Sequence, residues 1–347
     1  MSHFISNKIC CIADIHIGVH GNSPFWHKIH TDWAKWLVAE LKSKNIKDIV
    51  ICGDFFDSRD EIAVNTLHEG ANILSLFNDF KITILCGNHD VFLKNSSTIN
   101  SLQGFKQWPN VTVVDKLFEV SQNGKDYAFV PWGVPLSEIK TKKHIIFGHF
   151  EFASFKMNTS KVCEDGVSPH EAANLAPLTI SGHFHLKDYR MLNGSKVLYT
   201  GNPFEMDFGD SKAEKGYYIV DIDQLTTDFY VNNMSPKHEK IQLSWLVEKK
   251  SLTPEVINRI TNNIVRVVID RRISSDDSEL LFAKLKQYLP LSFNVETEYF
   301  NTFDVNEDKR DLSGVDIKQA IAEFVDILDI NNKQDVLAYV IDLYDKF

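Results

Sequence analysis

The sequence of 347 residues has no long hydrophobic run, and we expect no secretory leader. No segment approaches the roughly 18 consecutive apolar residues that a membrane-spanning helix needs. Residues 1–8 lack the basic start and apolar stretch of a signal peptide. We therefore expect a cytoplasmic protein that makes no membrane contact.

Paired cysteine motifs are also missing. Five cysteines are present, as an adjacent pair and three single residues, and none has the Cys-x-x-Cys spacing of zinc or redox sites. They are Cys10, Cys11, Cys52, Cys86 and Cys163. We expect them to be reduced, buried side chains.

The chain lacks the basic excess typical of nucleic-acid-binding proteins, because its formal net charge is -10. This charge does not exclude such a partner. Bound metal ions can supply positive charge, and a basic partner subunit could supply further phosphate contacts. Thirteen histidines are present, and those that fall in short motifs at strand ends indicate metal ligands rather than surface scatter.

The central motif is an apolar run that ends in Gly87, Asn88, His89 and Asp90. Residues 82–86 predict a buried strand, and the glycine allows a sharp turn at its end. Ligands of open α/β sheets bind at the carboxyl ends of the strands. Asn, His and Asp can all hold a metal there. A polar turn with capping residues explains these four residues equally well when they are considered alone.

Four other predicted strands end in similar residues. Their polar residues are Asp14 and His16, Asp54, His149, and the pair His183 and His185. In an extended chain Asp14 and His16 would point to the same side, although an edge strand facing water fits that spacing too. We expect the five segments to meet at one sheet edge.

This set of residue types suits a site for two metal ions. Two divalent cations about 3.5 to 4 Å apart need a bridging carboxylate with mixed oxygen and nitrogen ligands. Together they generate hydroxide and hold the attacking and leaving oxygens. Asp54 suits the bridge, and the absence of cysteine favours manganese over a thiolate zinc site.

The predicted fold class is α/β. Three successive strand-and-helix units, with helices from residue 24 and over 62–80, predict a parallel sheet region with right-handed crossovers. The tryptophans of the first helix are expected in the core. Hairpins over 117–130 and 216–231 then make the sheet mixed.

Composition changes near residue 235, where the histidine motifs end. We expect a first domain over 1–235, a small α+β domain over 236–300, a charged linker over 301–314 and two amphipathic helices over 315–347. The α+β domain should contain strands over 266–270 and 293–299 and a helix over 278–289, with a capping run at 274–277. The two terminal helices would pack on a partner helix or back on the chain itself.

In chain order the motifs read Asp-x-His, Gly-Asp, Gly-Asn-His-Asp, Gly-His and Gly-His-x-His. The pattern resembles the calcineurin-type metallophosphoesterase superfamily. This resemblance implies a mixed-sheet sandwich that holds two divalent ions, Mn²⁺ or alternatively Mg²⁺. It assigns Asp14, His16, Asp54 and His185 to one ion, and Asp54, Asn88, His149 and His183 to the other.

The same resemblance leaves His89 free of the metals. An imidazole beside the scissile phosphate would stabilise developing charge or protonate the leaving oxygen. Asp90 is then the expected partner that orients this ring. A local loop cap is the alternative role for Asp90.

Within the superfamily the layout resembles the SbcD-type DNA-repair nucleases, especially phage recombination endonuclease subunits. The matching stretches are Asp-Ile-His-Ile-Gly at 14–18, Gly-Asp-Phe-Phe-Asp at 53–57, Phe-Gly-His-Phe-Glu at 147–151 and Ser-Gly-His-Phe-His at 181–185. The small capping domain and the terminal helix pair match by architecture. The resemblance implies a manganese-dependent DNA exonuclease or endonuclease, and the choice is open because Asp57 stands where some members carry a histidine.

The resemblance also implies partners. These are DNA, an SMC-like coiled-coil ATPase bound through residues 315–347, and a second copy in a homodimer through the nuclease domain. The implied processes are DNA recombination, repair and replication, in the host cytoplasm if a phage encodes the chain. A metallophosphatase or cyclic-nucleotide phosphodiesterase is the alternative enzyme, and a scaffold that clamps an ATPase is a third hypothesis.

Overall fold

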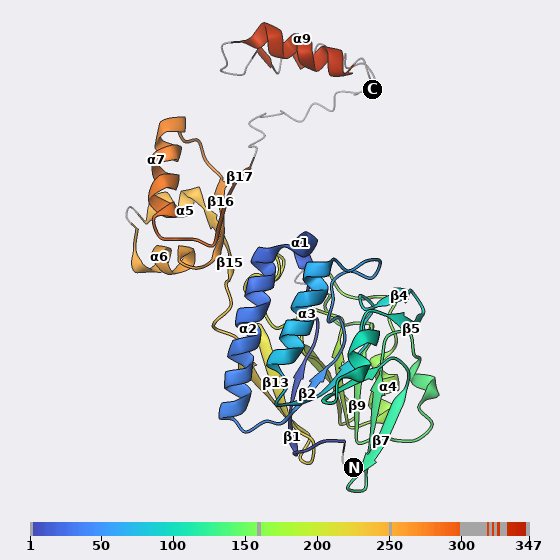
Figure 1. Cartoon of the computed structure of the whole chain (residues 1–347). Coiled ribbons are helices and arrows are strands. Elements are labelled where there is room, and N and C mark those ends of the chain that lie inside the picture. The colour runs from blue at the N-terminus through green and yellow to red at the C-terminus, as the bar shows by residue number, and fades with distance from the viewer. Residues whose placement is uncertain are drawn as a thin grey trace. The chain divides into compact units, whose positions relative to one another are not determined.

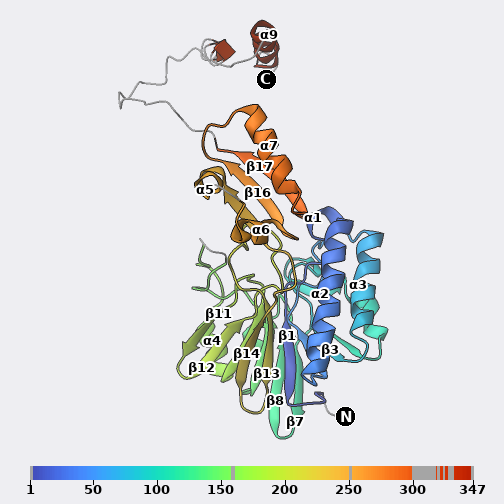
Figure 2. The same ribbon diagram turned by 90° about the vertical axis from the view of Figure 1, so that its left-hand side faces the viewer.

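The computed structural model describes residues 3–157, 161–249, 252–298, 318, 321–322, 325–326 and 332–344. The chain forms two compact units, residues 1–298 and residues 299–347. The first unit contains two six-stranded sheets, one three-stranded sheet and a two-stranded hairpin, and Figures 1 and 2 show it from two directions.

The first large sheet has the strand order β14-β13-β1-β2-β3-β6. Its strands are β1 (Lys8–Ile12), β2 (Asp48–Ile51), β3 (Lys81–Leu85), β6 (Val111–Val114), β13 (Gly216–Asp221) and β14 (Thr226–Val231). The four strands β1, β2, β3 and β6 are parallel, whereas β13 runs antiparallel to β1 and to β14. The predicted parallel region and the mixed sheet are therefore confirmed.

The second large sheet has the order β11-β12-β10-β9-β8-β7. Its strands are β7 (Phe118–Gln122), β8 (Lys125–Val130), β9 (Ile145–His149), β10 (Leu178–Gly182), β11 (Asp188–Leu192) and β12 (Ser195–Tyr199). Its predicted hairpin turns at Asn123 and Gly124, which have φ angles of 53° and 72°. Asn-Gly favours this turn because both positions need a positive φ.

The two sheets pack face to face around a shared apolar core. Alternate residues of β1 separate between its two faces: Ile9 and Cys11 enter the core between the sheets, where Phe129 and Phe147 also lie. Ile12 belongs to the cluster on the other side, which the helices cover. Burial on both faces explains why the central strands are continuous apolar runs rather than alternating ones.

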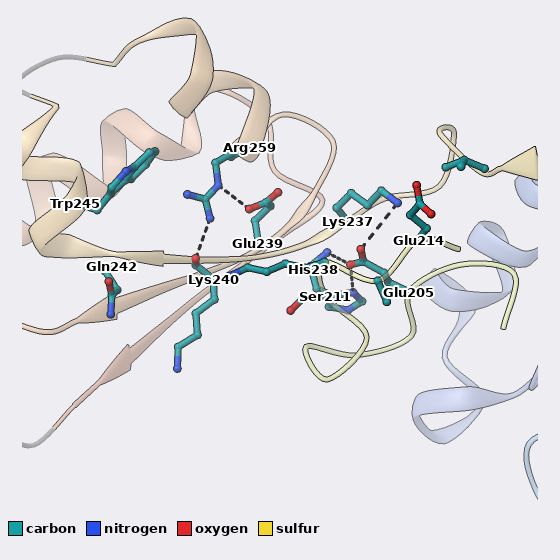
Figure 3. Close-up of a pocket in the computed structure, with 13 residues that line it drawn as sticks. Glu205, Ser211, Glu214, Lys237, His238, Glu239, Lys240, Gln242, Trp245 and Arg259 are labelled. Atoms are coloured by element: carbon teal, nitrogen blue, oxygen red, sulfur yellow. Dashed lines mark hydrogen bonds and ion pairs between the residues drawn. The ribbon is translucent and has the colours of Figure 1, made fainter. Parts of the chain in front are cut away.

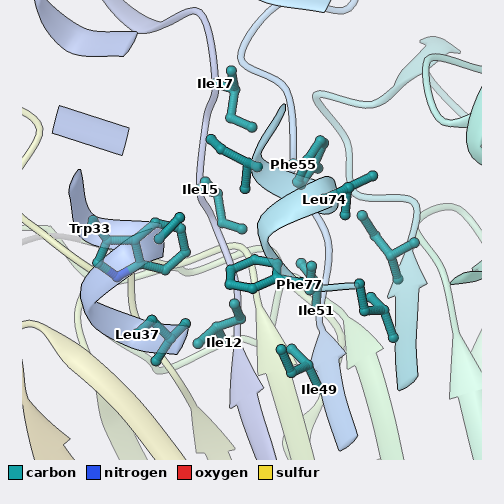
Figure 4. Packing of buried hydrophobic residues seen from close by; sticks show 14 of the residues in the cluster. Ile12, Ile15, Ile17, Trp33, Leu37, Ile49, Ile51, Phe55, Leu74 and Phe77 are labelled. Carbon is teal, nitrogen blue, oxygen red and sulfur yellow. The ribbon is translucent and has the colours of Figure 1, made fainter. Parts of the chain in front are cut away.

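Helices cover the outer faces of the sandwich. They are α1 (Val19–Asn22), α2 (Pro24–Ser43), α3 (Val64–Leu76) and α4 (Pro169–Leu175). Figure 4 shows Trp33 and Leu37 of α2 packed over the strand residues Ile12 and Ile49. The prediction that tryptophans of this helix lie in the core is confirmed for Trp26 and Trp33, whereas Trp36 is partly buried against the core. The third helix is shorter than the predicted 62–80, because Phe77 and the residues after it turn back into β3.

Short elements connect these layers near the site. They are β4 (Val91–Leu93), β5 (Ser96–Asn100) and the 3-10 helices η1 (Gln103–Gln107) and η2 (Leu136–Glu138). The hairpin of β4 and β5 begins directly after the central motif, because Val91 follows Asp90.

The three-stranded sheet is parallel and follows residue 237. It comprises β15 (His238–Gln242), β16 (Ile264–Ile269) and β17 (Ser292–Thr297), with helices α5 (Leu243–Glu248), α6 (Pro254–Ile260) and α7 (Ser275–Lys286). This segment has a hydrophobic cluster of its own, which includes Ile241, Val265 and Leu285. It belongs to the same compact unit as the large sheets, and the boundary near residue 235 stays a prediction.

The predicted cap of α7 gives a small test of local stability. The Ser274 side chain accepts a hydrogen bond from the Asp277 amide at 3.1 Å. We expect Ser274→Ala to destabilise the helix by about 1 kcal/mol, which would speed hydrogen exchange of the α7 amides about fivefold. Ser275→Ala, one residue later on the exposed surface, is the control and should leave exchange unchanged.

The second unit contains helix α9 (Lys333–Tyr344), which covers the second of the two predicted terminal helices. The linker predicted over 301–314 lies outside the described residues, and the first terminal helix is described at only five positions, all helical. Among the parts of the chain that the structure describes, no helix has the length and apolar character needed to cross a membrane.

Candidate metal centre

The structure brings all the predicted metal ligands together. They are Asp14, His16, Asp54, Asn88, His149, His183 and His185. Those from Asp14 to Asn88 follow β1, β2 and β3 of the first sheet, whereas the last three histidines come from the ends of β9 and β10 of the second sheet. The prediction of a single sheet edge is therefore wrong, because the packing of the two sheets brings two edges together.

The loops after β1 and β2 are joined by main-chain hydrogen bonds. The Asp14 amide donates to Gly53 O at 3.0 Å, and the Ile15 and His16 amides donate to Asp54 O at 2.8 and 3.1 Å. Asp14, His16 and Asp54 have φ angles of 55°, 50° and 52°. The prediction that Asp14 and His16 share one side of an extended chain is therefore wrong, since each turns through left-handed backbone.

The first group of donor atoms comes from Asp14, His16 and Asp54. One atom from each of these side chains lies within 4.8 Å of the others. The Nε2 atom of His16 is 3.7 Å from Asp54 Oδ2 and 3.1 Å from Nε2 of His185. This group and His185 match the first predicted ligand set.

The second group comes from Asp54, His149 and His183, again within 4.8 Å. The Nε2 atom of His149 lies 3.3 Å from Asp54 Oδ2 and 2.9 Å from Oδ1 of Asn88. Asn88 Oδ1 is also 2.8 Å from Nδ1 of His183. His149 Nδ1 lies 2.7 Å from the carbonyl of Cys52, which can only accept, so Nδ1 donates and Nε2 is the ring nitrogen that faces the cluster.

This crowding of electron pairs fits divalent cations. The Nε2 atoms of His16 and His185 face each other at 3.1 Å, and buried carboxylates of Asp14 and Asp54 stand beside them. The electron pairs of such nitrogen and oxygen atoms repel one another unless a proton or a cation lies between them. The cluster contains carboxylate, amide and imidazole groups but no thiolate, and this set of ligands suits Mn²⁺ or Mg²⁺. Asp54 belongs to both groups, as a bridging ligand must.

Burial and mutual charge shift the pKa values in the cluster. Burial raises the pKa of Asp14 to about 7. Burial would also raise the pKa of Asp54, but attraction to His149 holds it below its usual range. Burial lowers the pKa of His183 to about 3 and that of His185 to about 4, so both imidazoles stay neutral and available as ligands.

His89 lies at the edge of the cluster and is only partly buried. Its amide donates to Asp54 Oδ1 at 2.8 Å, and its ring Nδ1 lies 2.5 Å from the main-chain oxygen of Asp57. Because a carbonyl oxygen only accepts, Nδ1 must be the donor. The Nε2 atom is then the position at which this ring can carry or release a second proton.

Asp90 has different contacts from those predicted. Its buried carboxylate accepts hydrogen bonds from the amides of Phe55, Phe56 and Gly87 at 2.9 to 3.2 Å. It therefore holds the loop after β2 against the turn after β3. These hydrogen bonds go to main-chain amides and not to the His89 ring, so the prediction that Asp90 orients this ring is wrong. The alternative prediction, that Asp90 caps a local loop, agrees with these contacts.

Two residues at the site were not assigned a role from the sequence. Asp57 Oδ1 lies 3.2 Å from His16 Nδ1, and its position as the second acid of Gly-Asp-Phe-Phe-Asp was the available signal. Lys215 donates to the carbonyl of His185 at 2.9 Å. A lysine in a polar segment gives no sequence signal of this kind, because exposed lysines are the norm.

A cavity of about 710 Å³ lies between the β15 segment and residues 205–214 (Figure 3). None of the predicted metal ligands is among its lining residues. Four of its lining side chains pair with one another: Arg259 Nε is 2.6 Å from Glu239 Oε2, and His238 Nδ1 is 3.4 Å from Glu205 Oε2. The cavity is distinct from the metal-ligand cluster.

The chain is similar to several known proteins. The chain is 24% identical over 351 residues to exonuclease subunit 1 of Enterobacteria phage T4, covering 97% of this chain and 98% of that protein. It is 29% identical over 180 residues to putative phosphoesterase 078R of Invertebrate iridescent virus 3, covering 47% and 49% of the two chains. A solved archaeal phosphodiesterase shares 14% identity with a TM-score of 0.37, over 65% of this chain and 99% of that one. The calcineurin-like phosphoesterase superfamily domain matches residues 8–225, which include every predicted metal ligand, and the chain belongs to this superfamily.

Proposed function

We propose that this protein is a metal-dependent DNA nuclease, the nuclease subunit of an SbcCD-like ATPase-nuclease complex in DNA recombination, repair and replication. The observation that supports the proposal most strongly is the cluster of predicted metal ligands, with the partly buried His89 at its edge. The similarity over almost the full chain to a phage exonuclease subunit supports DNA as the substrate.

In this proposal two divalent ions, Mn²⁺ or alternatively Mg²⁺, occupy the cluster. Asp14, His16, Asp54 and His185 would hold one ion, and Asp54, Asn88, His149 and His183 the other. When bound, the ions would activate water and neutralise charge on the phosphate oxygens. The neutral imidazoles of His183 and His185 and the ionised Asp54 have the protonation states that ligands need.

His89 is proposed to act on the scissile phosphodiester. Its main chain is tied to Asp54 and its ring to the carbonyl of Asp57. These two contacts leave Nε2 as the atom that can donate a proton to the leaving oxygen or hydrogen-bond a phosphate oxygen. Asp90 supports this arrangement from beneath by holding the loop that carries Asp54 and Asp57.

The proposed partners are DNA, an SMC-like coiled-coil ATPase and a second copy of the nuclease domain, in the host cytoplasm. The relative with exonuclease in its name is itself called a subunit, which supports a complex. We propose that residues 315–347 bind the ATPase. A net charge of -10 implies modest DNA affinity for the chain alone, because phosphate neutralisation dominates DNA binding, so a partner would strengthen it.

The test compares substrates. The purified full chain is incubated with linear duplex, single-stranded and closed circular DNA, and separately with bis-p-nitrophenyl phosphate and p-nitrophenyl phosphate. We expect DNA cleavage with Mn²⁺ and none with EDTA, and a preference for linear over circular DNA would indicate exonuclease action. An Asp54→Ala protein purified in parallel controls for contaminating nucleases.

Turnover of the small phosphoesters without any cleavage of DNA would contradict the proposal. That outcome would favour the alternative, a metallophosphatase or cyclic-nucleotide phosphodiesterase. The partner assignment is tested separately by capture of a coiled-coil ATPase from the native cell with the full chain and with a chain lacking residues 315–347. Equal capture by both would show that these residues are not the binding segment.

A further inference from the structure

Lys215 places a buried ammonium group beneath the loop that carries His185. Its side chain is 1% exposed. The Nζ atom donates to the carbonyl of His185 at 2.9 Å, to Asn202 Oδ1 at 2.5 Å and to Asp210 Oδ1 at 2.6 Å. A lysine ammonium has three hydrogens, so these three acceptors use all of them.

The partners of Lys215 are themselves fixed. The other oxygen of Asp210 accepts from Asn202 Nδ2 at 2.8 Å and from the Met206 amide at 3.0 Å. The main-chain amide of Asn202 donates to the same His185 carbonyl at 3.3 Å. The main chain at His185 is therefore held by two donors of one closed, buried network.

The loop at His185 needs such an external support. It lies between β10 and β11 and belongs to neither strand, so no ladder of main-chain hydrogen bonds fixes its carbonyl. The adjacent Phe184 is buried against Tyr199 and anchors one side of the loop. The Lys215 network anchors the other, polar side, and the ring of His185 then stands with Nε2 3.1 Å from Nε2 of His16.

The buried ion pair of Lys215 and Asp210 is energetically costly, because both charges are removed from water. Replacing a buried ion pair with apolar residues of similar volume is often neutral or stabilising. An apolar side chain at position 215 could not donate to the His185 carbonyl, however. The network therefore gives the loop an orientation that apolar packing would not supply.

We propose that Lys215 is a positioning residue for His185, which it holds in place for metal binding through the main-chain carbonyl. The inference rests on the proposed metal site and adds a residue outside the ligand set. It applies to one ion only, because the Lys215 network contacts His185 and none of the ligands proposed for the other ion.

The experiment measures Mn²⁺ binding without DNA, by calorimetry and by the EPR signal of coupled ions. Lys215→Met alone would leave the Asp210 carboxylate buried without its cation and is expected to lower Tm. The informative variants therefore carry Asp210→Asn as well. Lys215→Met/Asp210→Asn removes the donor to His185, whereas Lys215→Gln/Asp210→Asn is equally neutral but keeps an N–H donor.

We expect the Met double variant to fold, to bind one Mn²⁺ normally and to bind the second about 10- to 100-fold more weakly, the usual range for supports of metal ligands. Its EPR spectrum should show uncoupled Mn²⁺. The Gln double variant should recover part of the lost affinity. Lys187→Met, which removes a partly exposed lysine paired with Glu214, should bind both ions as the wild type does.

Four results would overturn the inference. The first is a Met double variant that binds two ions as tightly as the wild type, and the second is equal affinity of the Met and Gln double variants. The third is equal weakening of both ions, and the fourth is a matching loss of affinity in Lys187→Met. A protein that needs Lys215 for the second ion but cuts no DNA would contradict the proposed nuclease function alone.

Discussion

Replacing His89 with alanine is expected to lower kcat for DNA cleavage by about 10²–10⁴-fold, the usual contribution of a positioned proton donor. The ring lies at the edge of the donor cluster, with Nδ1 committed to the carbonyl of Asp57. Alanine removes the Nε2 group but keeps the main-chain amide that donates to Asp54. The metal ligands should therefore stay in place, and KM should change less than kcat.

The measurement is steady-state cleavage of linear duplex DNA in Mn²⁺, together with metal binding by calorimetry. His68→Ala is the matched control, since this histidine is exposed on α3 and contributes nothing to the cluster, so its rate should equal that of the wild type. Cleavage by His89→Ala at the wild-type rate would exclude the proposed role. Loss of a bound ion in His89→Ala would instead make this histidine a ligand.

The chain's local pattern was enough to predict the parallel core and the residues that the structure brings together in the candidate metal centre. Apolar runs that end abruptly in Gly, Asp, Asn or His mark strand ends, as at β2 before Asp54 and β3 before Asn88. These signals are local, because a buried strand must be apolar along its length and its polar ligands can begin only where it ends.

Other features depend on contacts between distant segments and have no local signal. The left-handed backbone at Asp14 and Asp54 follows from hydrogen bonds between loops about 40 residues apart, a spacing set by the helix α2 between them. The origin of His149 and His183 in a second sheet likewise follows from how two sheets pack. The contacts of Asp90 were mispredicted for the same reason, because its three amide donors include two from the loop after β2.

The small α+β segment was predicted only in part, and composition explains why. Its strands β16 and β17 and the capped helix α7 lie within a few residues of their predicted ranges. Strand β15 was missed because His238–Gln242 is largely polar, and helices α5 and α6 have only six and seven residues. Elements this short show too few periods of hydrophobic spacing to be recognised.

Gly87 offers a second large effect, because the site has no room for a side chain there. A Cβ atom at this position would lie 2.1 Å from Asp54 Oδ1 and 2.3 Å from the Asp54 amide nitrogen. The second of these atoms is main chain and cannot rotate away, so Gly87→Ala must push apart the loops after β2 and β3. Gly87 is not among the glycines with positive φ, so the effect arises from overlap and not from backbone strain.

We expect Gly87→Ala to lose about 100-fold in DNA cleavage, the cost of displacing a reacting group by about 1 Å. Affinity for both ions should fall together, because Asp54 belongs to both donor groups, whereas loss of the Lys215 support should weaken only one. Gly104→Ala is the control, since a Cβ atom there meets nothing within 4 Å. Titration with Mn²⁺ distinguishes these two variants. Weaker binding of both ions by Gly87→Ala agrees with an Asp54 that they share, whereas wild-type affinity for one ion would mean that Asp54 does not bridge them.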